Sequence, residues 1–223
     1  MVSTYLRAAR GVRCGPEQVV LLSGGQQAID LVIKTLLDPG ATVWVEDPGY
    51  PATAAALLAA GVHVRPVPVD AEGLDVGEGV RRAPGARAAF VTPSHQFPLG
   101  CAMSMRRRLA LLAWARDARA WVVEDDFDSE FRYSGKPLAS LQGLDEAGRV
   151  IYVGTFSKVL FPGLRLGYAV VPPALAHVFQ AARFLSDRFA PTILALPRFA
   201  WIMPRSERAG AAGRSRRDRS FAA

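Results

Sequence analysis

The sequence has little cysteine, little lysine and no long hydrophobic run, and each shortage narrows what the chain can be. Its 223 residues include two cysteines, Cys14 and Cys101, which lie far apart and form no Cys-x-x-Cys pair. A structural zinc site is therefore not expected, and a reducing, cytoplasmic compartment suits the chain best. No stretch of about 18 apolar residues is present, so we expect no transmembrane helix. The first residues lack the apolar region of a signal peptide.

Lysine is scarce even though the chain is basic. Of 27 cationic side chains only three are lysines, namely Lys34, Lys136 and Lys158, so arginine fills nearly every position where a surface cation is wanted. Arginine stays protonated in proteins, whereas a lysine amine can lose its proton and react with a carbonyl group. Lys158 follows an apolar, strand-like run, and a lysine in that place suggests lysine-specific chemistry.

The composition indicates a globular protein, because 50% of the residues are hydrophobic and 21% are charged. The basic excess is concentrated at the end, where residues 205–223 carry +4 of the net charge of +7. We therefore expect one domain over residues 1–196 and a disordered basic tail over residues 197–223. A solvated tail without a binding role is the simpler interpretation, and contact with nucleic acid is the alternative.

Strand-like and helix-like segments alternate, which predicts an α/β fold with a mostly parallel sheet flanked by helices. Apolar, β-branched runs predict strands at 18–23, 42–47, 63–70, 86–94, 120–128, 149–157 and 165–173. Helical spacing predicts helices at 25–40, 51–61, 73–83 and 104–119, and a last one that ends near Arg188. Ser104 should be an N-cap, and two prolines, Pro66 and Pro68, should place the strand 63–70 at an edge of the sheet.

Ligands bind beyond the carboxyl ends of the strands in such sheets, so the residues after each strand form the candidate site. The turn Ser23-Gly24-Gly25-Gln26 joins a strand to a helix, where free N–H groups and the positive end of the helix favour a phosphate. The turn matches neither the dinucleotide fingerprint nor the P-loop, and a plain turn is the alternative. Arg165 offers a second phosphate contact, or is an ordinary loop arginine.

Two further strand ends carry residues that suit a flat, cationic ring. Asp125 closes an apolar strand, where a carboxylate is costly to bury unless a cation pairs with it. Tyr50 follows a Pro-Gly turn and either stacks on a ring or packs at the rim. The acidic run 124–126 would suit a metal instead, but neighbours in a strand point to opposite faces and no histidine is close in sequence. With Lys158 and the phosphate turn, these residues describe a site for pyridoxal 5'-phosphate.

The motifs also resemble a known family. The segments LLSGGQQAIDL, VEDPGYP, TPSHQFPLG, VVEDDFDSEFRY and VGTFSKVLFPGLRLGY resemble fold type I, class I/II aminotransferases that depend on pyridoxal phosphate. They are most similar to the aminotransferase-like domain of MocR-type regulators, a subgroup of the bacterial GntR family. The resemblance implies amino-group transfer between an amino acid and a 2-oxo acid through a lysine Schiff base. Its alternative is an effector- or cofactor-sensing module that regulates transcription, truncated and without turnover.

The resemblance implies a role for each matching residue. Lys158 matches the lysine that forms the Schiff base and moves a proton, Asp125 matches the partner of the pyridine nitrogen, and Tyr50 matches the aromatic residue that stacks on the ring. The phosphate-binding positions, with two helpers named last, are Gly25, Gln26, Arg165, Thr155 and Ser157.

Other matches depart from the family. His95 or Gln96 falls where aminotransferases place an asparagine near the cofactor hydroxyl, and Phe127 falls where relatives often carry a tyrosine that bonds this hydroxyl. We expect neither the N-terminal winged helix nor the small C-terminal domain of the relatives, which suggests a truncated chain that is out of frame after about residue 196. A third hypothesis is therefore a degenerate fragment that folds partly or not at all.

The resemblance also indicates partners. It implies a small-molecule amino acid or amine as the ligand and a homodimer as the assembly, because fold type I proteins usually have their site at a subunit interface. Without a winged helix the chain is not expected to bind DNA directly, and no membrane contact or metal site is implied.

Overall fold

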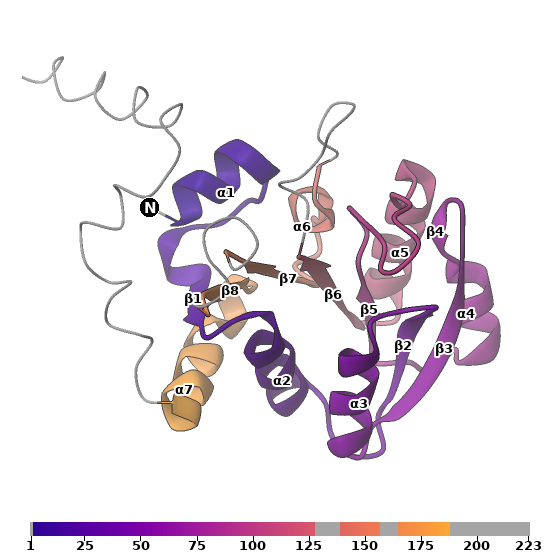
Figure 1. Cartoon of the computed structure of the whole chain (residues 1–223), viewed down its shortest axis with the longest axis horizontal. Helices are drawn as coiled ribbons and strands as arrows, with labels where there is room; N and C mark the ends of the chain where they lie inside the picture. Colours follow the sequence, from indigo (N-terminus) through magenta and orange to yellow (C-terminus); the bar gives the residue numbers. More distant parts are fainter. Residues whose placement is uncertain (1, 128–138, 157–164, 188–223) are drawn as a thin grey trace, which may run out of the picture. The chain divides into compact units, whose positions relative to one another are not determined.

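The computed structural model describes residues 2–127, 139–156 and 165–187, and these form one eight-stranded sheet with helices on both faces (Figure 1). The strand order is β1-β8-β7-β6-β5-β2-β3-β4. The strands are β1 (Val19–Leu22), β2 (Thr42–Asp47), β3 (His63–Asp70), β4 (Gly73–Leu74), β5 (Ala88–Val91), β6 (Trp121–Asp126), β7 (Val150–Thr155) and β8 (Gly167–Val170).

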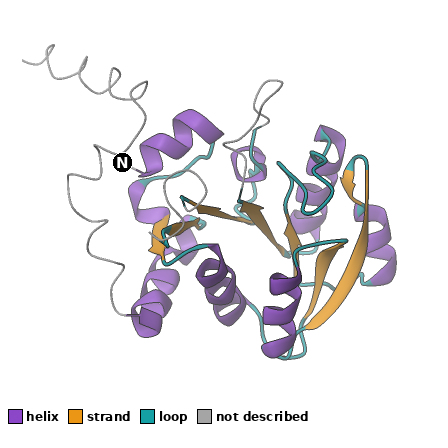
Figure 2. Cartoon of the chain, viewed as in Figure 1, coloured by secondary structure: helices purple, strands orange, loops and turns teal. Residues whose placement is uncertain are grey.

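The helices divide between the two faces of the sheet (Figures 1 and 2). They are α1 (Val2–Arg10), α2 (Gly25–Leu36), α3 (Pro51–Ala59), α4 (Val76–Arg82), α5 (Met105–Asp117), α6 (Leu141–Leu144) and α7 (Ala176–Asp187), with short 3₁₀ turns at Pro16–Gln18 and Pro173–Leu175. One apolar core joins the sheet to α2, α3 and α7, and a second joins it to α4, α5 and α6. None of the described helices is long and apolar enough to cross a membrane.

The direction of the strands confirms the prediction of a mostly parallel sheet. The strands β3, β2, β5, β6 and β7 pair in parallel, whereas β8 runs antiparallel to both β7 and β1, and β4 is antiparallel to β3. The carboxyl ends of β1, β2, β5, β6 and β7 therefore meet at one edge of the sheet. Both faces of β2, β5, β6 and β7 are covered, which explains why these strands begin as continuous apolar runs.

The residues of the strands alternate between the two cores. In β2, Val43 and Val45 belong to the core with α2, whereas Trp44 belongs to the core with α5, where its ring stacks on Trp114 at 3.9 Å between centroids. Each fully buried large side chain of this kind contributes about 1.5–3 kcal/mol. The packing on both faces fixes the register, since a shift of one residue would exchange the two sets of side chains.

Most expected elements are present, with some changed bounds. The strand β3 was expected at an edge of the sheet, and the short strand β4 lies outside it. Because β4 pairs only with Val69 and Asp70, the rest of the outer side of β3 is unpaired. The helix expected from residue 73 begins at Val76, since Gly73-Leu74 pairs with β3 and the Asp75 side chain caps Glu78 N. The helices α1 and α6 were not expected.

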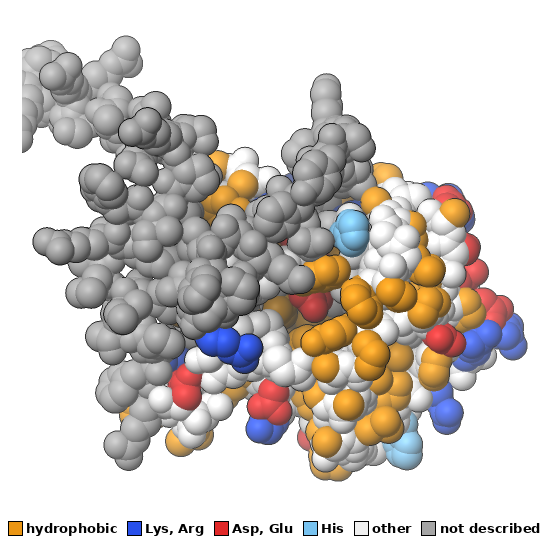
Figure 3. All heavy atoms as spheres, in the orientation of Figure 1, with side chains coloured by type: hydrophobic (Ala, Val, Ile, Leu, Met, Phe, Trp, Pro, Cys, Tyr) orange, Lys and Arg blue, Asp and Glu red, His pale blue; other side chains and the backbone are white. Residues whose placement is uncertain are grey.

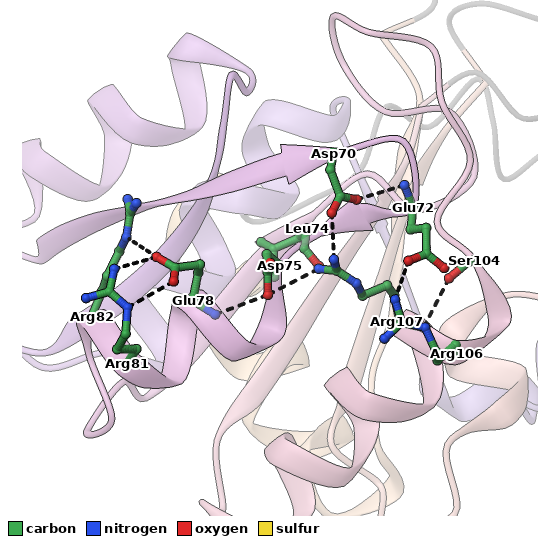
Figure 4. A network of polar contacts seen from close by, with 10 residues as sticks. All are labelled: Asp70, Glu72, Leu74, Asp75, Glu78, Arg81, Arg82, Ser104, Arg106 and Arg107. Carbon is green, nitrogen blue, oxygen red and sulfur yellow. Dashed lines mark hydrogen bonds and ion pairs between the residues drawn. The ribbon is translucent and has the colours of Figure 1, made fainter.

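A network of ion pairs connects β3, α4 and α5 at the β3–β4 side of the sheet (Figure 4). The guanidinium group of Arg107 on α5 contacts Asp70 at 2.6 Å and Asp75 at 3.3 Å, and so joins β3 to the start of α4. Glu78 pairs with two arginines of α4, Arg81 and Arg82. These contacts explain how the short strand β4 is held, and they involve none of the candidate site residues.

Candidate functional site

Three consecutive carboxylates end β6, and they have different surroundings. Glu124 accepts hydrogen bonds from the backbone N–H groups of Leu141 and Gln142, both at 2.9 Å, and so caps α6. Asp126 points to the same face and is buried with Arg10 of α1, whose Nε donates to its Oδ2 at 2.8 Å. The hydroxyl group of Tyr152 on β7 also donates to Asp126. Both carboxylates thus have partners within the protein.

Asp125 lies on the opposite face and has no such partner. It lines a pocket of about 230 Å³, together with Tyr50, Glu46 and apolar side chains of α2, β5 and β6. No hydrogen bond or ion pair joins the side chain of Asp125 to another residue in the described part of the chain. Burial, reinforced by the charges of Asp126 and Glu46, raises the pKa of Asp125 to about 7. A cation placed in the pocket would stabilise the ionised form of Asp125, and a protonated ring nitrogen is such a cation.

The structure gives no support to the metal alternative for residues 124–126. The side chains of Glu124 and Asp126 are engaged on one face while Asp125 faces the other. Within residues 2–127, 139–156 and 165–187, no three His, Cys, Asp or Glu side chains come together in a way that would hold a metal ion.

The glycine turn before α2 has the features of an anion site. The helix begins at Gly25, and its N-cap, Gly24, supplies no side chain to occupy the free N–H groups. Gly24 has φ of 115°, which a residue with a side chain would adopt only under strain. A Cβ atom on Gly167 of β8 would lie 2.5 Å from the carbonyl carbon of Gly24, so both positions require glycine. Gln26 is exposed on the first turn of the helix.

Arg165 reaches this turn from the segment that precedes β8. Its Nη2 atom lies 3.9 Å from the place where a Cβ atom of Gly24 would be. Arg165 is exposed and has φ of 48°, a left-handed conformation that costs a non-glycine residue about 1–2 kcal/mol. The hydroxyl group of Thr155 donates to Leu166 O at 3.1 Å and so tethers the segment. The helix N-terminus and the guanidinium group together suit a phosphate.

Gln27, which sequence reasoning passed over, braces the same turn. Its Oε1 atom accepts from Ser23 N at 2.5 Å, and its Nε2 atom donates to Asp187 Oδ2 of α7 at 3.0 Å. The helical spacing of α2 shows where Gln27 lies but not what it bonds, because its partner is 160 residues away in the sequence.

Aromatic side chains form the other side of the site. Tyr50 is 44% exposed at the start of α3, and the ring of Phe97 meets it edge-on at 5.6 Å between centroids. Phe97 also contacts Phe127, which contacts His95 in turn, at 6.2 and 6.1 Å. Hydrophobic side chains gather over α3 and the neighbouring loops (Figure 3). Phe97 was not among the expected site residues, although its place between two aromatic rings makes it part of this wall.

The loop after β5 separates the two residues expected near the cofactor hydroxyl. His95 is exposed and lies outside the lining of the pocket. Gln96 is 1% exposed, and its amide group is used entirely by protein atoms. Of the two alternatives, only His95 therefore has a side chain free to meet a ligand.

The expected site residues thus fall into two groups along one edge of the sheet. Asp125 and Tyr50 line the pocket, whereas the phosphate-binding group lies at the ends of β1 and β7, outside the pocket lining. The pocket continues beneath α3, where Pro51, Thr53 and Ala54 line it. Lys158 and Ser157 lie outside the described residues, between Thr155 and Arg165.

Comparisons with known proteins identify the family of the chain. A family model described as aminotransferase class I and II matches residues 2–219. The probable rhizopine catabolism regulatory protein MocR of Rhizobium meliloti is 50% identical over 179 residues, which cover 80% of this chain and 36% of that protein. The resemblance inferred from the motifs, both to class I/II aminotransferases and to MocR-type regulators, is confirmed.

Solved aminotransferases share the fold. A Pyrococcus horikoshii kynurenine aminotransferase in complex with PMP gives a TM-score of 0.79 at 34% identity, covering 85% of this chain and 48% of that one. LysN, an α-aminoadipate aminotransferase of Thermus thermophilus complexed with N-(5'-phosphopyridoxyl)-L-leucine, gives 0.76 at 33%, covering 93% and 55%. The chain therefore spans between 36% and 55% of the length of these three relatives.

Proposed function

The chain belongs to the aminotransferase class I and II family, and from this premise we propose that it binds pyridoxal 5'-phosphate and serves amino-group transfer between an amino acid and a 2-oxo acid. One observation carries the proposal. Of three adjacent carboxylates, Asp125 alone faces a pocket without a partner in the described residues, and its pKa is raised to about 7. The solved relatives that hold pyridoxamine or phosphopyridoxyl groups support the same cofactor.

Each end of the cofactor would meet residues of matching chemistry. Asp125 would accept the ring N–H, and Tyr50 would cover one face of the ring. His95 would lie near the ring hydroxyl, where Phe127 has no group to bond it. The phosphate would be held by the start of α2 and the loop before β8, through Gly25, Gln26, Thr155, Ser157 and Arg165.

Lys158 would supply the reactive amine. Its amine would hold the cofactor through the carbonyl group, and as a free amine it would carry the proton that leaves the substrate Cα. When bound, the cofactor supplies an electron sink for the bond that breaks at this carbon. Asp125 would remain ionised and keep the ring nitrogen protonated, while Tyr50 would exclude water from one face of the ring.

A second function has its own support. The most similar proteins reported above include a regulatory protein, at 50% identity. The same cofactor site would then sense an amino acid or amine as part of a longer transcriptional regulator, with or without turnover. In either function we propose a homodimer in the cytoplasm. We also propose that residues 1–196 form the cofactor-binding domain and that residues 197–223 form its basic tail.

One experiment tests the cofactor directly. Pyridoxal 5'-phosphate is added to the full chain, near-visible absorbance is recorded, and the lysine–cofactor bond is reduced with borohydride before peptide mapping. We expect the label on Lys158. Lys34→Arg, which replaces an exposed lysine paired with Asp30, should label normally, and Lys158→Ala should not. A label elsewhere, or none, overturns the proposal.

A second measurement separates the two functions. Amino acids are added to the cofactor-loaded protein with a 2-oxo acid, and the appearance of the new amino acid is followed. Turnover supports the transferase function, whereas a spectral change without turnover supports the sensing function.

A further inference from the structure

The side chain of Gln96 connects the loops that follow two neighbouring strands, β5 and β2. Its Nε2 atom donates to Pro48 O at 2.8 Å and to Phe97 O at 2.7 Å, and its Oε1 atom accepts from Leu99 N at 3.0 Å. The residue is 1% exposed. One amide group thus fixes the loop 92–100 internally and ties it to the turn 48–50.

Glu46, near the end of β2, binds Thr92 and Gln96 and so joins β2 to the same loop. Its Oε2 atom accepts from Thr92 N at 3.1 Å, from Thr92 Oγ1 at 2.6 Å and from Gln96 Nε2 at 3.3 Å. Glu46 is 7% exposed. Two strand ends and both of their loops therefore meet in one buried polar cluster, which we call the Gln96 cluster: Glu46, Thr92 and Gln96.

The cluster acts on the residues around Tyr50. The carbonyl group that Gln96 binds belongs to Pro48, two residues before Tyr50, and Gly49 between them packs closely against the carbonyl oxygen of Glu46. Phe97, the residue after Gln96, meets the Tyr50 ring edge-on at 5.6 Å. The same loop thus contacts the turn that carries Tyr50, at Pro48, and the ring of Tyr50, through Phe97.

We propose that Gln96 is a positioning residue that sets the orientation of the Tyr50 ring, and through it the fit of a flat ring in the pocket. The second part rests on the proposed function, and the first does not. Gln96 itself is not part of the pocket lining, and its amide group is used by protein atoms. If Gln96 had only a structural role, its replacement would lower the stability of the fold without a specific effect on Tyr50. If it is a positioning residue, its replacement changes the environment of the Tyr50 ring as well.

The chain offers a matched control for this difference. Gln142 also clamps a loop by two bonds, since its Oε1 atom accepts from Arg13 N at 2.7 Å and its Nε2 atom donates to Arg13 O at 2.8 Å. Among the described residues, no hydrogen bond joins Gln142 to the turn 48–50 or to the loop 92–100. Gln96→Met and Gln142→Met each remove side-chain hydrogen bonds to loop backbone atoms while keeping similar side-chain volumes.

The first test needs no cofactor. The full chain is labelled with 3-fluorotyrosine, and Tyr50→Phe identifies the Tyr50 resonance among the five tyrosines by ¹⁹F NMR. We expect Gln96→Met to shift or broaden this resonance and Gln142→Met to leave it unchanged. Gln96→Asn, which keeps the amide but is too short for all its bonds, serves if the methionine variant does not fold. An unchanged Tyr50 resonance in a folded Gln96 variant overturns the proposal.

The second test is a double-mutant cycle on the affinity for pyridoxal 5'-phosphate. Gln96→Met should weaken binding about tenfold in the wild-type background and less than about twofold in the Tyr50→Ala background. Equal losses in both backgrounds would show that Gln96 does not act through Tyr50. If the wild-type chain binds no cofactor, the proposed function fails, while the fluorine experiment still decides the orientation of Tyr50.

Discussion

At the scale of single residues, the end of β6 shows how one run of acids serves different tasks. A buried carboxylate costs several kcal/mol unless it is paired. The N–H groups of α6 offset part of this cost for Glu124, although burial and the charge of Asp126 still raise its pKa to about 7. Asp126 is paired with Arg10 and Tyr152. Asp125 is partly exposed at the pocket and its side chain has no such partner among the described residues, which is expected of a group whose partner is a ligand.

The first prediction concerns Asp125→Asn in the chain without cofactor. Because the folded-state pKa is raised from 3.8 to about 7, the folded state binds more protons than the unfolded state between these values. The contribution of Asp125 to stability therefore falls as pH rises through this window. We expect Asp125→Asn to be more stable than the wild type at pH 8, by roughly 1–3 kcal/mol, with the difference vanishing near pH 4.

Urea denaturation at several pH values measures this difference. Asp117→Asn is the control, because Asp117 is exposed and its pKa is lowered by the adjacent Arg116, so its contribution has the opposite sign. A wild-type chain that is more stable than Asp125→Asn at pH 8 would mean that Asp125 has a partner within the protein.

The sequence predicted the face of Asp125 but not the direction of Gln96. Alternation along an apolar strand separates Asp125 from its neighbours, and this rule needs no knowledge of the rest of the chain. Gln96 lies in a loop, where its direction depends on the carbonyl group of Pro48 and the carboxylate of Glu46, about 50 residues earlier. No local pattern encodes that meeting.

At the scale of elements, α1 is joined to the sheet by a buried ion pair. The side chains of Arg10 and Asp126 are 6% and 1% exposed, and Asp126 adjoins the candidate ring-nitrogen partner. The helix was not expected because its nine residues carry few large apolar side chains. Ser104, in contrast, was predicted as an N-cap and accepts from Arg107 N at 3.3 Å, since capping is a local signal.

The second prediction tests this ion pair. Arg10→Met should lower the free energy of unfolding by about 3–5 kcal/mol, because it leaves Asp126 buried without its cation. Lys34→Met, which breaks an exposed pair with Asp30, should change it by less than about 1 kcal/mol. Arg10→Met combined with Asp126→Asn should recover part of the loss. Equal effects of the two single substitutions, measured in urea, would contradict the role given to Arg10.

The third prediction concerns the loop before β8. Arg165→Ala should weaken binding of pyridoxal 5'-phosphate at least about tenfold and leave binding of pyridoxal, which has no phosphate, nearly unchanged. Arg119→Ala is a matched control, since Arg119 is also exposed with a left-handed backbone, at φ of 52°. Titrations followed by absorbance measure both ligands. An equal loss for the two ligands would place Arg165 away from the phosphate.

At the scale of the whole molecule, the order of the strands gathers the site. The residues of the phosphate turn and those of the pocket come from β1, β2, β6 and β7, which are far apart in sequence but share one edge of the sheet. The alternation of elements predicted a parallel sheet and hence a common edge. It did not predict that β8 lies between β1 and β7, because antiparallel insertion depends on long-range pairing, such as that of Gly167 with Thr155.

The fourth prediction follows from this common edge, because a ligand that bridges the two groups should stabilise the folded chain as a unit. Pyridoxal 5'-phosphate at a hundredfold excess over its Kd should add about 2.7 kcal/mol to the free energy of unfolding. At one fixed ligand concentration the gain should be larger at pH 8 than at pH 5.5, because Asp125, with a pKa of about 7, must be ionised to pair with the ring N–H. Thermal unfolding with and without the ligand measures the gain. The control is Asp125→Asn, which keeps whatever pH dependence comes from the cofactor phosphate and from the lysine. If the gain depends on pH as strongly in this variant as in the wild type, the dependence comes from groups other than Asp125.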